Sequence, residues 1–292
     1  MPLGAYPDPP EPLAADAVDS HCHLDLGDGA RDDSDAAGLS VDDAVAAAAR
    51  VGVTRIVQVG CDVPGSQWAV EAARRVPSVV AAIALHPNEA PRLEAAGGRP
   101  ALEAAWDAIE RLAGDERVRA IGETGLDFYR TGDDGRAAQE ESFRRHIALA
   151  KEHGKALVIH DRDAHDEVLR VLEDEGAPER VVFHCFSGDL AMARHCAERG
   201  YVLSFAGPVT FKNAAGLREA LAATPIGQLL VETDAPYLTP MPYRGRPNAS
   251  YLIPLTLRAM AEVVAVDADA LAAATTATAL RVFGPWEPAS RG

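Results

Sequence analysis

The sequence lacks the features that mark secreted and membrane proteins. Its four cysteines, Cys22, Cys61, Cys185 and Cys196, include no C-x-x-C pair, which is typical of reduced thiols in a cytoplasmic protein rather than of a disulfide framework. No apolar run is long enough to cross a bilayer, and the N-terminus lacks the basic and apolar regions of a signal peptide. We therefore expect a cytoplasmic protein that makes no contact with membranes.

Positive charge is also scarce. The 28 Lys and Arg residues face 44 Asp and Glu residues, which gives a formal net charge of −16. Proteins that hold nucleic acid by bulk electrostatics are usually basic. A phosphate-bearing substrate must therefore be held locally, by metal ions and a few arginines. No patch in the sequence indicates an obligate protein partner.

Short apolar segments of β type alternate with segments of helical periodicity along the chain. The predicted strands cover residues 17–23, 55–60, 79–86, 118–126, 155–160, 180–186, 201–206 and 228–234. One predicted helix begins after a capping box at Ser40 and Asp43. The other predicted helices cover residues 66–75, 101–112, 139–152, 164–173, 190–198, 213–223, 251–264 and 269–283.

Eight strand–helix units predict an α/β protein, a single (β/α)₈ TIM barrel over residues 16–284. The alternative is a doubly wound open sheet, but no Gly-rich dinucleotide fingerprint follows the first strand. Residues 1–15 are expected to form a flexible arm and residues 285–292 a C-terminal tail.

Metal-binding side chains occur at the ends of five predicted strands. Side chains two residues apart on a strand share a face, so His21 and His23 should point the same way. The other residues of this kind are Glu123, His160, His184 and Asp234. In a parallel barrel the carboxyl ends of the strands meet at one mouth. This donor set exceeds one tetrahedral site and predicts two divalent ions.

The predicted assignment puts His21 and His23 on one ion, and His160 and His184 on the other. Glu123 would bridge the ions, and Asp234 would bind metal and accept the proton of the attacking water. Mixed His and carboxylate ligation suits Zn, Mn, Fe or Co, and Mg less well. Two acids are expected to support the ligands by hydrogen bonds: Glu232, on the same strand face as Asp234, and Asp19.

Basic and aromatic residues follow several of these strands. Arg162 and Arg244 are predicted to hold a phosphate by charge-assisted hydrogen bonds, and His86 to contact the substrate. Phe128 and Tyr129 could stack a base, although aromatic residues at the start of a loop more often pack. Four other histidines lie on helical patterns and are interpreted as surface or helix-capping residues: His146, His153, His165 and His195.

Six motifs resemble those of the TatD-type metal-dependent deoxyribonucleases, in that family's order. They are Asp19-Ser-His-Cys-His-Leu-Asp25, Leu85-His-Pro87, Ile121-Gly-Glu-Thr-Gly-Leu-Asp127, Val158-Ile-His-Asp-Arg-Asp-Ala164, His184-Cys-Phe-Ser-Gly188 and Val231-Glu-Thr-Asp-Ala-Pro-Tyr-Leu-Thr-Pro240. The resemblance implies an amidohydrolase-like TIM barrel with metal ligation by the six residues named above. It also implies hydrolysis of DNA, commonly from 3′ ends and preferably single-stranded, supported by Mg²⁺ or Mn²⁺. Asp161 and Thr278 depart from the family's usual residues.

Two other functions fit the sequence. A hydrolase of C–N or ester bonds, such as a deacylase, could use the same barrel and metals. Many such relatives bridge their metals with a modified lysine at strand four, where this sequence has Glu123, so the nuclease is favoured by analogy. A non-catalytic binding protein would be supported by a missing ligand, and none is missing.

Overall fold

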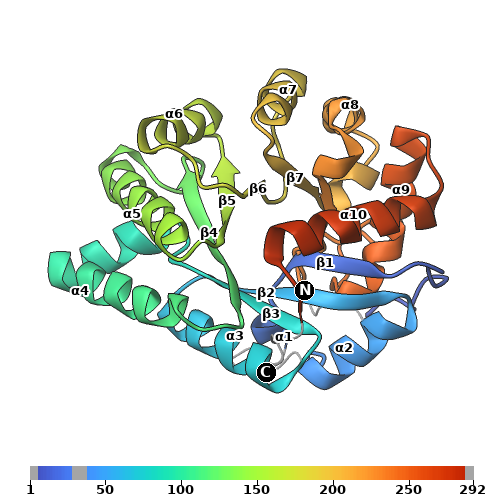
Figure 1. The fold of residues 1–292 in the computed structure, drawn as a ribbon, viewed down its shortest axis with the longest axis horizontal. Helices are drawn as coiled ribbons and strands as arrows, with labels where there is room; N and C mark the ends of the chain where they lie inside the picture. The colour runs from blue at the N-terminus through green and yellow to red at the C-terminus, as the bar shows by residue number, and fades with distance from the viewer. Residues whose placement is uncertain (1–5, 28–37, 287–292) are drawn as a thin grey trace. The chain divides into compact units, whose positions relative to one another are not determined.

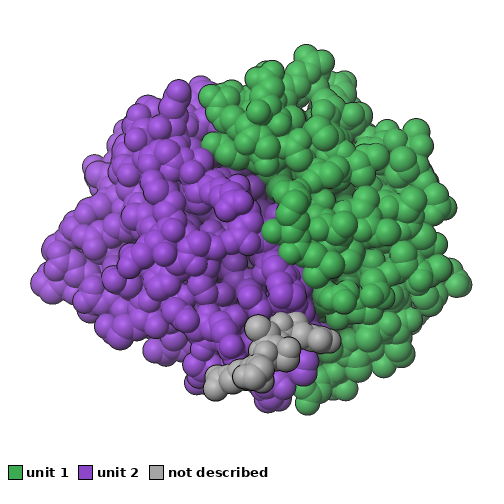
Figure 2. All heavy atoms as spheres, in the orientation of Figure 1, with its two compact units in different colours: residues 1–58, 188–281 green, residues 59–187, 282–292 purple. Residues whose placement is uncertain are grey.

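The computed structural model describes residues 6–27 and 38–286. The chain forms two compact units, which Figure 2 colours separately. Unit 1 comprises residues 1–58 and 188–281, and unit 2 comprises residues 59–187 and 282–292. The first five residues of the predicted arm and residues 287–292 of the predicted tail lie outside the described residues. The domain boundaries at residues 16 and 284 stay predictions.

Eight strands follow one another in the sheet order β1 to β8 (Figure 1). They are β1 Ala17–Cys22, β2 Val53–Gly60, β3 Val79–Ile83, β4 Val118–Asp127, β5 Ala156–Arg162, β6 Val181–Phe183, β7 Val202–Phe205 and β8 Leu229–Val231. Pairing is parallel between β1 and β2 and between β7 and β8 in unit 1, and from β3 through β6 in unit 2. A parallel bridge between Cys22 and Ala235 also joins the end of β1 to the chain after β8. This is the topology of the predicted barrel.

Helices alternate with the strands. They are α1 Leu24–Gly27, α2 Val41–Arg50, α3 Val63–Arg75, α4 Glu89–Ala113, α5 Asp133–Glu152, α6 His165–Glu175, α7 Leu190–Glu198, α8 Ala215–Ala223, α9 Ile253–Val264 and α10 Ala268–Phe283. Short 3₁₀ turns cover η1 Gly207–Thr210, η2 Ile226–Gln228 and η3 Ser250–Leu252. Within unit 2, α3 to α6 pack against β3, β4 and β5 (Figure 1).

Side-chain caps fix the start of three helices. Ser40, Asp62 and Asp189 accept hydrogen bonds from the backbone N–H groups of Asp43, Gly65 and Met192, at 3.2, 2.7 and 2.9 Å. Each such cap stabilises its helix by about 1 kcal/mol. Among the described residues, no single helix is long and apolar enough to cross a membrane; the pair Ser250–Val264 and Ala268–Phe283 passes that test jointly but is bent by 103°.

Three strands end three residues earlier than the sequence predicts. β3, β6 and β8 end at Ile83, Phe183 and Val231, so His86, His184 and Asp234 lie in the segments that follow. The physical reason is visible at Asp234, whose φ of 54° is left-handed and incompatible with a strand. The prediction that Glu232 and Asp234 share one strand face is therefore wrong, because β8 does not reach either residue.

The described part of the predicted arm, residues 6–15, makes contacts with the rest of unit 1. Leu13 is buried, and its N–H donates to the Val51 carbonyl at 3.1 Å. The Ala14 N–H donates to Asp269 Oδ1 at 2.8 Å, and the Tyr251 hydroxyl donates to the Pro7 carbonyl at 2.6 Å. A proline-rich sequence can thus be held by contacts with its own domain, which composition alone does not reveal.

Candidate metal sites

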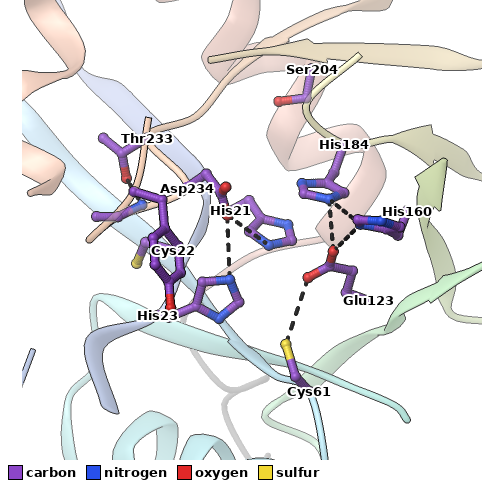
Figure 3. A network of polar contacts seen from close by, with 12 residues as sticks. His21, Cys22, His23, Cys61, Glu123, His160, His184, Ser204, Thr233 and Asp234 are labelled. Carbon is purple, nitrogen blue, oxygen red and sulfur yellow. Dashed lines mark hydrogen bonds and ion pairs between the residues drawn. The ribbon is translucent and has the colours of Figure 1, made fainter. Parts of the chain in front are cut away.

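Three predicted ligands lie together in unit 1: His21, His23 and Asp234, here called the Asp234 cluster. His23 Nε2 lies 3.3 Å and His21 Nε2 lies 3.7 Å from Asp234 Oδ1 (Figure 3). The two imidazole rings meet edge to face, with centroids 5.1 Å apart. His21 lies in β1 and His23 directly follows it, and both rings face the same Asp234 oxygen.

Hydrogen bonds from β1 position the segment that carries Asp234. The Asp234 N–H donates to the His21 carbonyl at 2.9 Å. The Asp19 carboxylate accepts from the N–H and the hydroxyl of Thr233 at 2.9 and 2.6 Å. Burial raises the pKa of Asp19 to about 6, although hydrogen bonds from Thr233 and Ser250 oppose that shift. Asp19 thus ties β1 to the chain beside Asp234.

Glu232 lies in the same segment and is fully buried. Its backbone N–H donates to the Phe205 carbonyl at 3.1 Å, which continues the pairing with β7 past the end of β8. The hydrogen-bonding support that the sequence assigns to the Glu232 carboxylate stays a prediction.

Three further predicted ligands lie together in unit 2: Glu123 in β4, His160 in β5 and His184 directly after β6. We call them the Glu123 cluster. Glu123 Oε1 lies 2.6 Å from His160 Nδ1 and 2.9 Å from His184 Nε2 (Figure 3). The two histidine nitrogens are 3.4 Å apart. The sequence therefore identifies three side chains that the fold brings into contact from separate strands.

Gly125 allows β4 to approach β5 at this point. It pairs with His160 in the β4–β5 ladder and has a φ of 135°. A Cβ atom at this position would lie 2.1 Å from the His160 carbonyl oxygen, which no side chain can tolerate. The glycine therefore sets the distance between the strands that carry Glu123 and His160.

The Glu123 carboxylate is held in its ionised form. Burial opposes ionisation, but the charges and hydrogen bonds of His184, His86 and His160 keep the pKa of Glu123 well below its usual range. Burial alone would lower the pKa of His160. Hydrogen bonds with Asp127 and Glu123 and the charge of Glu123 act more strongly, and the pKa of His160 is raised. An ionised carboxylate surrounded by imidazoles is a donor set that attracts a divalent cation.

Three neighbours complete the Glu123 cluster. His86 Nε2 lies 3.5 Å from Glu123 Oε1, and its ring centroid is 4.6 Å from that of His160. His86, predicted to contact substrate, therefore also contacts the ligands themselves. Burial lowers its pKa. Asp127 Oδ2 lies 3.4 Å from His160 Nε2, and the Cys61 thiol donates to Glu123 Oε2 at 3.6 Å.

Sequence reasoning missed the contacts of Cys61 and Asp127. The available signal was position: Cys61 directly follows β2, and Asp127 is the last residue of β4. Both therefore lie at strand carboxyl ends, like the residues that were identified. In unit 1, Tyr237, a residue of the last motif to which no role was assigned, is 54% exposed, with its ring 6.5 Å from that of His23.

The two predicted phosphate-binding arginines each lie over an aromatic ring. Arg162 Cζ is 3.9 Å from the ring centroid of Tyr129 in unit 2, and Arg244 Cζ is 4.5 Å from that of Phe211 in unit 1. Asp161 does not neutralise Arg162, because its carboxylate lies 2.7 Å from His165 Nδ1. Adjacent strand residues point to opposite faces, which separates the acid from the arginine.

The helical pattern suggested that His146 is a surface or helix-capping residue, but the structure shows that it is buried. Its side chain is 2% exposed on α5. The Leu85 N–H donates to its Nε2 at 3.3 Å, and its Nδ1 lies 2.9 Å from the Thr124 hydroxyl. Burial lowers its pKa to about 4. The imidazole therefore packs in neutral form between α5 and the strands of unit 2.

Both clusters fit a divalent metal by the chemistry and spacing of their donors. Ligand atoms about 2.1 Å from one ion lie roughly 3.0–3.4 Å apart, depending on the coordination geometry. The nitrogen-to-oxygen distances from Asp234 and Glu123 to their histidines run from 2.6 to 3.7 Å. The donor atoms of His21, His23 and Asp234, and those of His86, Glu123 and His160, lie within 4.8 Å of one another.

Comparison with known proteins gives the chain its relatives. A family model described as TatD related DNase matches residues 18–284. An uncharacterized metal-dependent hydrolase TatD from Mycobacterium tuberculosis is 47% identical over 271 residues, which covers 91% of this chain and 97% of that protein. An uncharacterized metal-dependent hydrolase YcfH from Escherichia coli is 36% identical over 268 residues, covering 91% of this chain and 95% of that protein.

A solved structure extends the likeness to the fold. The crystal structure of YJJV, a TatD homologue from Escherichia coli K12, superposes with a TM-score of 0.79 at 26% identity, covering 91% of this chain and 97% of that one. A TatD family hydrolase from Entamoeba histolytica gives 0.76 at 19% identity, covering 94% and 99%. Together with the strand order, these similarities confirm the predicted fold class.

Proposed function

The chain belongs to the TatD related DNase family and is a metal-dependent hydrolase, and from this we propose that it cleaves phosphodiester bonds in DNA. Two groups of imidazole and carboxylate donors, the Asp234 cluster and the Glu123 cluster, are the observation that carries the proposal. Each group is large enough to hold one divalent ion. We propose that single strands are cut from their 3′ ends.

Six residues would hold the metal: His21, His23 and Asp234 in unit 1, and Glu123, His160 and His184 in unit 2. When bound, divalent ions lower the pKa of water and neutralise charge on a phosphate undergoing displacement. We propose two ions per chain, with Mg²⁺, Mn²⁺ or Zn²⁺ as candidates. That Glu123 bridges them stays a prediction.

Asp234 accepts the proton of the attacking water in this proposal. Its side chain is 15% exposed, against 0% for His21, so water can reach it. Its position is fixed from both sides by the hydrogen bond to the His21 carbonyl and by the bond from the Tyr237 N–H to its own carbonyl, both at 2.9 Å. A general base held within reach of the nucleophile in this way needs no rearrangement before it acts.

Glu123 contributes a fixed negative charge. Because its pKa is held well below its usual range, it stays ionised across the whole physiological pH range and remains a metal ligand. Arg162 and Arg244 would bind the phosphates of the substrate by charge-assisted hydrogen bonds. His86 would contact substrate, and burial lowers the pKa of its imidazole.

Digestion of end-labelled single-stranded DNA tests the proposal. The protein is loaded with Mg²⁺, Mn²⁺ or Zn²⁺ and compared with EDTA-treated protein and with Asp234→Asn. Asp134→Asn, an exposed acid in the first turn of α5, is the matched control. We expect metal-dependent shortening from the 3′ end that Asp234→Asn abolishes and Asp134→Asn does not change.

The same experiment can reject the nuclease. Intact DNA after incubation with protein shown by elemental analysis to hold metal would rule out the phosphodiesterase. Ester and amide substrates would then be assayed with the same variants, because a C–N or ester hydrolase uses the same donors. We also propose a cytoplasmic location, because the four cysteines include no C-x-x-C pair and are interpreted as reduced thiols.

A further inference from the structure

Unit 2 exposes an aromatic ring beside the Glu123 cluster. Tyr129 lies in the loop after β4 and is 65% exposed. Its loop is anchored, because the Phe128 N–H donates to the Arg162 carbonyl at 2.9 Å and the Arg130 N–H donates to Asp127 Oδ1 at 2.8 Å. A large ring held in water by a fixed backbone is a feature that binding surfaces use.

The guanidinium of Arg162 covers one face of this ring, with Cζ 3.9 Å from the centroid. Among the described residues, no carboxylate lies within 4.0 Å of the Arg162 guanidinium. By contrast, Arg144 and Arg170 on the helices α5 and α6 pair with Glu140 and Glu167 at 2.8 and 2.7 Å. An arginine that stacks on a ring and lacks an acid partner keeps its charge and N–H groups for an anion.

The pair lies one strand step beyond a metal ligand. His160 and Arg162 are two residues apart on β5, so their side chains share a face and are separated by about 7 Å along the strand. Asp127, which accepts the hydrogen bond that shapes the Tyr129 turn, also lies 3.4 Å from His160 Nε2. The ring and the guanidinium therefore lie next to the Glu123 cluster, on the same face of β5 as His160.

We propose that Tyr129 and Arg162 form a nucleotide subsite that binds single-stranded nucleic acid. Arg162 binds a phosphate, and a base stacks on the face of Tyr129 that the guanidinium leaves open. An internal base of a duplex would not bind in this way, because neighbouring bases cover both of its faces. The inference rests on the proposed function and narrows its substrate to strands with unstacked bases.

Binding of two fluorescent probes tests the subsite. One is a short oligothymidylate, and the other is a chain of equal length in which tetrahydrofuran residues replace every nucleoside. Affinities are measured by fluorescence anisotropy with Mn²⁺, using the full chain carrying Asp234→Asn so that no cleavage occurs. Base stacking on an aromatic side chain typically changes affinity about tenfold or more.

We expect Tyr129→Ala to weaken oligothymidylate binding about tenfold and to leave the abasic chain unchanged, while Tyr129→Phe retains affinity. Arg162→Ala should weaken both probes. Arg136→Ala is the matched control, because Arg136 also lies over an aromatic ring of this loop, 4.1 Å from the centroid of Phe128, but is paired with Asp133 at 3.1 Å. It should change neither affinity.

The outcomes separate the subsite from the proposed function. Equal weakening of both probes by Tyr129→Ala, no weakening at all, or no binding of oligothymidylate would overturn the subsite. Base-dependent binding in a protein that cleaves no DNA would leave the subsite standing and reject the nuclease. Cleavage of DNA by Tyr129→Ala with an unchanged KM would support the nuclease and reject the subsite. Circular dichroism confirms that each variant is folded.

Discussion

Replacement of His146 by glutamine should change how stability depends on pH. The buried imidazole accepts a hydrogen bond from the Leu85 N–H at Nε2, so it can remain there only while Nε2 carries no proton. Glutamine offers an oxygen and an amide in place of the two ring nitrogens, and it does not titrate. The variant therefore still offers one acceptor and one donor at this position, but it has no ionisable group.

The magnitude follows from the displaced pKa. Burial lowers the pKa of His146 to about 4, whereas a histidine in the unfolded chain titrates near 6.5. Below pH 6.5 the unfolded state takes up a proton that the folded state refuses, so stability is lost as the pH falls from about 6.5 to about 4. The loss amounts to about 2 kcal/mol at pH 5 and about 3 kcal/mol below pH 4.

Urea unfolding at pH 8 and pH 5, with EDTA present throughout, measures this effect. Other titrating groups are common to both proteins, so the wild type should lose about 2 kcal/mol more than His146→Gln between the two pH values. His153→Gln, at the half-exposed end of the same helix, controls for the loss of a histidine as such. Equal losses in wild type and His146→Gln would refute the reasoning.

Three further predictions concern the metals, a glycine and a cap. His23→Ala and His184→Ala should each lower the bound divalent metal by about one equivalent in elemental analysis; a single variant that loses all metal would show that the clusters do not bind independently. Gly125→Ala should lower the free energy of unfolding in urea by roughly 3 kcal/mol or more, whereas Gly114→Ala, with open space around it, should change it by less than about 1 kcal/mol. Ser40→Ala should cost about 1 kcal/mol by removing the cap of α2, and no shift in the urea midpoint would count against that cap.

The periodicity of the sequence was enough to predict that these helices form, but not where each begins and ends. The helix predicted over residues 190–198 matches α7 at both ends, because Asp189 caps an apolar-periodic segment. α4 begins at Glu89, before the predicted start at residue 101, since Pro100 and the Gly97-Gly98 pair resemble a loop. Gly98 does break the helix with a φ of 66°, but helical turns precede it. Turn-forming residues inside the helix therefore led to a wrong prediction for the start of α4.

The ligand types of the site were predictable, and their surroundings were less so. Donors such as His160 were recognisable because five predicted strands each end in a metal-binding side chain at the same mouth, whereas one such histidine alone would carry little weight. The burial of His146 had a signal that was not used: Phe143, Ile147 and Ala150 are buried on α5, and His146 falls on the same face at helical spacing. No signal in the sequence indicated the direction of the Asp234 side chain, because a left-handed backbone at an aspartate leaves no sequence pattern.

The acidic net charge does not exclude an anionic substrate, because charges of opposite sign are distributed unevenly over the described elements. On α5 and α6, Arg144 and Arg170 are paired with acids, Arg144 with Glu140 and Glu175 and Arg170 with Glu167. Arg162 at the end of β5 and Arg244 after β8 lie over aromatic rings, and neither has an ion-pair partner among the described residues. The carboxylates nearest to the imidazoles are those that would bind metal, and a bound divalent cation reverses the local sign. An acidic protein can therefore present a positive site to a phosphate, and binding that depends steeply on metal but weakly on salt would distinguish this arrangement from attraction by bulk charge.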